Sequence, residues 1–118
     1  MTKPKIYTIA FGKVYDLLIK KVEKKHRSKE EVDKIIKWMT GYSQSELNDK
    51  VEDGTDYETF INEAPNLNPD RTKITGMICG VRVEDMDASI MKEIRYLDKM
   101  VDELAKGQVL EKIFRQKL

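Results

Sequence analysis

The residues best suited to chemistry lie in one short stretch, NPDRTKITGMICGVRVED, residues 68–85. It contains Cys79, the only cysteine of the chain, together with Arg71, Arg82 and Glu84. A cysteine attacks as its thiolate, which requires a neighbouring histidine, a cation or a helix N-terminus. Arginines bind phosphates and carboxylates through paired hydrogen bonds. The stretch therefore suggests two kinds of functional site, a catalytic site with a thiol nucleophile and a binding site for a small anion.

The backbone conformation around Cys79 distinguishes a functional role of this stretch from a purely structural one. As a strand, GMICGVRV would alternate its side chains between two faces, but no partner strand is evident. As a helix, the segment has a good N-cap in Asn68 and a proline at its first position. We favour a central, glycine-containing helix near 69–80, in which Cys79 is buried and inert. An extended segment with an exposed thiol beside a guanidinium would remove this argument against catalysis.

Other catalytic and metal-binding arrangements find no support in the sequence. One histidine and one cysteine cannot supply the ligand spacing of a zinc site, and the acids form no calcium loop. The glycines do not form a phosphate-binding loop, and no serine lies in a nucleophile elbow. We therefore expect no metal and no cofactor.

Charge is distributed unevenly along the chain. Residues 1–29 hold nine lysines and arginines against two acids, a net charge of +7, whereas residues 30–118 hold thirteen against nineteen, a net charge of −6. Lys13, Lys20 and Lys24 share one side of the first predicted helix and form a candidate surface for an anion, which Lys21 and Lys25 would extend. Alternatively, this basic helix lies across acidic helices of the same molecule.

Two features of the sequence argue against nucleic acid as a partner. Residues 31–53, EVDKIIKWMTGYSQSELNDKVED, resemble a helix-turn-helix, but the polar positions of the second helix carry a net charge of −3. Such a helix would repel phosphates, whose neutralisation supplies much of the affinity for DNA. The basic first helix has no exposed aromatic side chains that could stack on bases. Binding through its lysines is therefore a third hypothesis only.

Hydrophobic periodicity and capping signals predict an all-α protein of about six helices. Ser28 with Glu31 and Ser43 with Glu46 form capping boxes, and Thr55 with Glu58 is a third candidate. Four predicted helices cover about 11–25, 69–80, 88–106 and 108–117. The others begin at the caps Ser28, Ser43 and Thr55 and end at Gly41, at Gly54 and near Pro65.

The bulk properties predict one domain covering 1–118. A single cysteine is typical of a reducing compartment, and no apolar run approaches the roughly 20 residues that span a bilayer. We expect a cytoplasmic protein without a membrane partner.

Three blocks of the sequence resemble a known family. These are FGKVYDLLIKKVEKKHRSKEEVDKIIKWMTGY, NPDRTKITGMICGVRVEDMD and MKEIRYLDKMVDELAKG. The chain resembles the short bacterial proteins grouped as domain of unknown function 2200. The resemblance implies a bacterial protein that folds as a small orthogonal helical bundle, which agrees with a helix over 69–80. It implies no activity and no catalytic residue.

Our leading hypothesis is a non-enzymatic binding or interaction module, because no set of nucleophile, base and orienting group can be assembled. Its partner would be another protein or a second copy of the chain. The alternative is an enzyme or a binder of small anions such as phosphate or carboxylate. That alternative would use Arg71, Arg82, Glu84 and Cys79.

Overall fold

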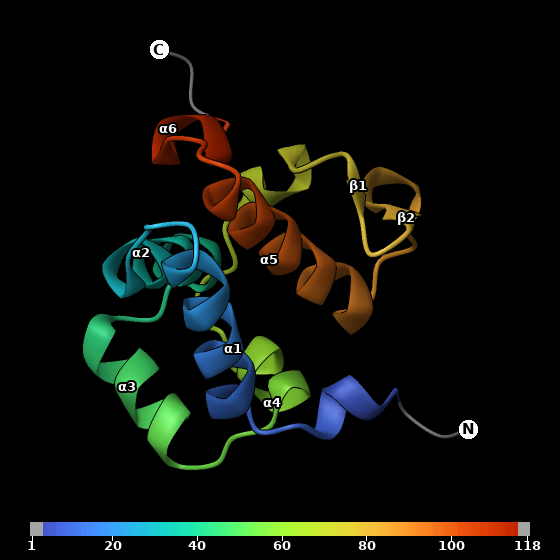
Figure 1. The fold of residues 1–118 in the computed structure, drawn as a ribbon. Coiled ribbons are helices and arrows are strands. Elements are labelled where there is room, and N and C mark those ends of the chain that lie inside the picture. The colour runs from blue at the N-terminus through green and yellow to red at the C-terminus, as the bar shows by residue number, and fades with distance from the viewer. Residues whose placement is uncertain (1–3, 116–118) are drawn as a thin grey trace.

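The computed structural model describes residues 4–115, which fold into a small helical bundle (Figure 1). Six α-helices lie within these residues: α1 (Phe11–Glu23), α2 (Lys29–Thr40), α3 (Gln44–Glu52), α4 (Tyr57–Asn62), α5 (Ile90–Ala105) and α6 (Leu110–Ile113). Three short 3-10 helices accompany them: η1 (Lys5–Thr8), η2 (Pro69–Lys73) and η3 (Val83–Asp85). A hairpin joins β1 (Met77–Ile78) to β2 (Val81–Arg82). The end of the predicted helix over 108–117 lies outside the described residues.

Helices α1 and α5 connect the bundle: α1 contacts α2, α3, α4 and α5, and α5 also contacts α2, α4 and α6 (Figure 1). The predicted apolar face of α1 is buried, and the apolar faces of α2 and α5 complete the core with it. Aromatic rings fill the end of the core next to α4, where Phe11 stacks on Phe60 with their centroids 3.7 Å apart. Between residues 4 and 115, none of the helices combines the length and the hydrophobicity that crossing a bilayer requires.

Helix α1 also approaches its neighbour α3 at backbone distance. A Cβ atom placed on Gly12 would lie 2.5 Å from the carbonyl oxygen of Val51, so only glycine fits at this contact. The glycine therefore sets how closely the first and third helices pack.

Two of the three predicted capping boxes form. Both directions of the hydrogen-bond exchange are present at Ser28 with Glu31 and at Ser43 with Glu46. The third prediction was wrong by one residue, since Asp56 caps α4 by accepting a hydrogen bond from the N–H of Thr59. Thr55 precedes the cap, and its hydroxyl donates to Asp53.

The predicted helix over 69–80 does not form, and this is the main correction to the sequence analysis. After the five residues of η2 the chain turns into the hairpin, in which Met77 pairs with Arg82 and Ile78 with Val81. Positive φ angles at Gly76, Cys79 and Gly80 exclude a right-handed helix there. The partner strand that was not evident from the sequence is β2, which begins three residues after β1 ends.

The tip of the hairpin is a two-residue loop, Cys79–Gly80, with φ angles of 51° and 79°. Positive φ at both positions is the requirement of a type I′ turn, which favours Asn-Gly and strains most other residues at the first position.

We therefore expect Cys79→Asn to stabilise the protein by about 0.5–1 kcal/mol, as relief of this strain. Cys79→Val should destabilise it, because a β-branched residue tolerates this conformation least. Chemical denaturation of the two variants checks the turn. Equal stabilities of the two variants would contradict a type I′ turn at this position.

Candidate functional site

The guanidinium group of Arg71 is already bound to other residues of the same molecule. It makes two hydrogen bonds to Glu93 of α5, at 2.7 and 3.1 Å, and a third to the carbonyl of Asn68 at 3.0 Å. The pair is mostly buried, with side-chain exposures of 19% for Arg71 and 15% for Glu93. These contacts tie η2 to the first turn of α5 and leave Arg71 poorly placed to hold a ligand.

The hairpin and η3 carry the other three candidates. Arg82 is exposed and lies 3.8 Å from Asp85. Glu84 accepts a hydrogen bond from the N–H of Gly76 at 3.1 Å, which closes the base of the hairpin. Hydrogen bonds from its own backbone N–H and from that of Gly76 hold the pKa of Glu84 below its usual value. The structure thus places Cys79 and Arg82 on the hairpin and Glu84 in η3 at its base, whereas Arg71 belongs to a separate contact with α5.

Cys79 is exposed at the tip of the hairpin, and the prediction that it is buried was wrong. The thiol is therefore not protected by burial late in a helix, contrary to the prediction. However, Cys79 has no hydrogen-bond partner within residues 4–115, so no base or orienting group accompanies the thiol there. An accessible thiol without such a group lacks the arrangement that nucleophilic catalysis uses.

The outward face of α1 offers a surface on which several charges of one sign lie together. Lysines at positions 13, 20, 21 and 24 lie on the outward face of α1 with Leu17 in their centre, and all five side chains are exposed. These positions are spaced by four, three, one and three residues, which keeps them on one face of a helix. We call these five residues the lysine stripe. It contains the three lysines predicted as an anion surface.

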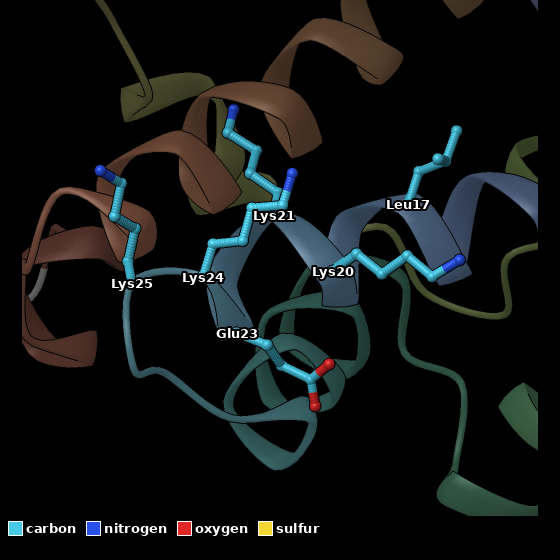
Figure 2. Close-up of a pocket in the computed structure, with 6 residues that line it drawn as sticks. All are labelled: Leu17, Lys20, Lys21, Glu23, Lys24 and Lys25. Atoms are coloured by element: carbon cyan, nitrogen blue, oxygen red, sulfur yellow. The ribbon is translucent and has the colours of Figure 1, made fainter.

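The lysine stripe borders a shallow depression of about 670 Å³, lined by Leu17, Lys20, Lys21, Glu23, Lys24 and Lys25 (Figure 2). Figure 2 shows Leu17, Lys21 and Lys24 extending to one side of α1, whereas Glu23 extends to the other. The acid that is closest in sequence therefore does not cover the ammonium groups of Lys21 and Lys24.

Intramolecular acids neutralise the lysine stripe only in part. Lys20 pairs with Asp16 one turn away at 3.0 Å, and Lys21 pairs with Asp102 of α5 at 3.3 Å. The alternative that basic and acidic helices lie across one another thus holds for Lys21. Among the ion pairs of residues 4–115, none involves Lys13, Lys24 or Lys25. These ammonium groups are open to an external anion.

A buried network of hydrogen bonds holds α1, the helix that carries the lysine stripe, against α2. Asp33 of α2, only 4% exposed, accepts hydrogen bonds from the Tyr15 hydroxyl of α1, from Lys29 and from Gln44 of α3. Burial, and then the hydrogen bond to Asp33, raise the pKa of Tyr15 to about 12, so the phenol remains a donor at neutral pH. The network joins α1, α2 and α3 from the side opposite to the stripe.

Leu17 is the residue of this surface that the sequence analysis missed. Its side chain is 66% exposed, although leucine is among the residues most often buried. The signal was present, because Leu17 falls between Lys13 and Lys20 on the polar face and out of phase with the buried positions. An apolar side chain inside a basic stripe distinguishes this surface from an ordinary solvated face.

The chain is similar to proteins whose roles are undescribed. The model of a family described as an uncharacterized protein conserved in bacteria, DUF2200, matches residues 5–115. The crystal structure of the uncharacterized protein SP1917 superposes with a TM-score of 0.90 at 41% sequence identity. That alignment covers 97% of this chain and 93% of the other. None of the curated proteins matches the chain significantly.

Proposed function

The chain belongs to the bacterial family DUF2200, to which no activity is assigned, and we propose that this member is a non-enzymatic interaction module. In this proposal the lysine stripe of α1 binds a negatively charged partner, and the protein acts in the cytoplasm. The observation that carries the proposal is the outward face of α1. There Lys13 and Lys24 lack intramolecular ion pairs within residues 4–115, and Leu17 is exposed between them.

The geometry supports this role better than the small-anion alternative. An anion-binding pocket needs unoccupied donors that converge on one point. The donors of Arg71 already bind Glu93 and Asn68, and Arg82 lies apart on the hairpin beside Asp85. The lysine stripe, by contrast, presents several positive charges on a single rigid element.

A binding assay with matched charge variants tests the proposal. We expect poly-L-glutamate to bind the protein at low salt, and Lys13→Gln/Lys20→Gln/Lys24→Gln to weaken that binding roughly tenfold to a hundredfold, because each exposed charge pair contributes up to about 1 kcal/mol. The control variant Lys34→Gln/Lys73→Gln removes exposed lysines elsewhere and should bind within about threefold of the wild type. Fluorescence anisotropy against salt concentration measures both.

Two results would contradict the lysine stripe as the binding surface. One is an equal loss of affinity per charge removed in both variants, which would indicate attraction to the net charge alone. The other is an affinity that does not fall as salt rises, because exposed ion pairs are screened.

A further inference from the structure

The lysine stripe has the spacing of a helix–helix contact. Lys13, Leu17, Lys20 and Lys24 are separated by steps of four, three and four residues, the pattern along which one helix meets another. The stripe extends over three turns, roughly 16 Å of helix axis. A straight ridge of this kind matches the side of a second helix better than it matches a compact small molecule.

The centre of the ridge adds an apolar requirement to the charge. Leu17 is 66% exposed and is flanked by Lys13 and Lys20 in the stripe. A partner with acidic groups alone would leave this leucine in water or press a carboxylate against it. A partner that places one large apolar side chain over Leu17, with acids on either side, matches both properties.

From this match we infer that the ligand of the lysine stripe is an acidic amphipathic helix of another protein. The inference rests on the proposed function and narrows its partner. The partner helix carries glutamates or aspartates at the steps that face Lys13, Lys20 and Lys24, and a leucine, isoleucine or methionine at the step that faces Leu17. Lys25, which also lines the depression, lies beside these positions and pairs with a further acid of the partner.

Nucleic acid matches the same surface less well. Within the lysine stripe the side chains are lysines and a leucine, so no arginine or aromatic ring is available to stack on a base. Phosphates also offer nothing apolar to cover Leu17. A second copy of the chain has exposed acids in α3 at Glu46, Asp49 and Glu52, but the apolar residues of that helix are buried or partly buried.

The test uses a synthetic helix of about 18 residues with Glu-x-x-x-Leu-x-x-Glu-x-x-x-Glu at its core. A second peptide replaces the leucine by glutamine at the same charge. We expect the leucine peptide to bind the wild-type protein roughly tenfold more tightly than the glutamine peptide. We expect Leu17→Gln to abolish that difference, whereas the control variant Lys34→Gln/Lys73→Gln, which changes exposed lysines outside the stripe, should preserve it.

The outcomes separate this inference from the proposed function. If both peptides and poly-L-glutamate bind equally well and Leu17→Gln has no effect, the surface is purely electrostatic and the inference fails while the proposed function holds. If a DNA duplex of about 20 base pairs binds more tightly than the leucine peptide at the same salt concentration, the partner class is wrong. If sedimentation velocity shows dimers that Leu17→Gln dissociates, the ligand is a second copy.

Discussion

Replacing Phe11 by alanine should lower the free energy of unfolding by about 3–5 kcal/mol, the typical cost of emptying a buried aromatic site. Phe11 is fully buried at the start of α1. Its ring stacks on Phe60 and meets the edge of Tyr57 with the centroids 5.3 Å apart. The alanine variant loses both contacts and leaves a cavity between α1 and α4 that rigid neighbours fill only partly. Because small domains are stabilised by about 5–15 kcal/mol, the loss is a large share of the total.

Urea denaturation of Phe11→Ala and of the matched variant Leu17→Ala measures the difference between the two faces of α1. Leu17→Ala removes an exposed side chain from the same helix and should change stability by no more than about 0.5 kcal/mol. Similar losses in the two variants would mean that Leu17 is packed in solution, and the lysine stripe would then not be a free surface.

The second large effect is expected at the buried carboxylate of Asp33. Asp33→Ala should cost about 2–3 kcal/mol, chiefly because the Tyr15 hydroxyl loses its acceptor inside the core. Lys29 contributes less to this cost, since its side chain is 46% exposed and its ammonium group can turn to water. Thermal and urea unfolding of the variant give the measured value.

A double-mutant cycle identifies the source of that loss. If the orphaned phenol is responsible, Tyr15→Phe in the Asp33→Ala background should cost at least about 1 kcal/mol less than it does in the wild type. Strict additivity of the two substitutions would show that the hydrogen bond contributes nothing. Binding to poly-L-glutamate by the folded fraction of each variant should stay close to that of the wild type, because neither residue belongs to the stripe.

The helical part of the fold follows from signals that are local in the sequence. The apolar spacing of α1, α2 and α5 and the capping boxes at Ser28 and Ser43 each involve residues within a few turns of one another. Such signals report on the backbone directly. At α4 two adjacent residues, Thr55 and Asp56, could both serve as the cap, and only the packed backbone decides between them.

The hairpin at 77–82 shows where local signals mislead. Pro69 and Asn68 do begin a helical turn, as predicted, but η2 ends at Lys73. Asparagine and glycine are the usual type I′ residues, so Cys79 in the left-handed conformation gave no sign of a turn. The two strands are only two residues long, which is too short for alternation to be recognised.

Of the candidate site, the sequence predicted the positions of the charged residues but not their ion-pair partners. The spacing of Lys13, Lys20 and Lys24 placed them on one outward face, whereas the partners of Arg71 and Lys21 lie on α5, far away in sequence. Ion pairs between distant residues depend on tertiary packing, so the sequence could not say which cations are satisfied within the molecule. Because Arg71 is bound to Glu93 and the lysines at 13 and 24 are not paired within residues 4–115, the surface of α1 is available to a partner and Arg71 is not.

The most direct test of the account is to locate the contact by NMR, with the leucine peptide titrated into ¹⁵N-labelled protein. We predict that the amide shifts change mainly at Lys13, Leu17, Lys20, Lys21 and Lys24, with smaller changes at Lys25 and little change in the hairpin. Changes centred on Cys79 and Arg82 would contradict the account and move the binding surface to the hairpin.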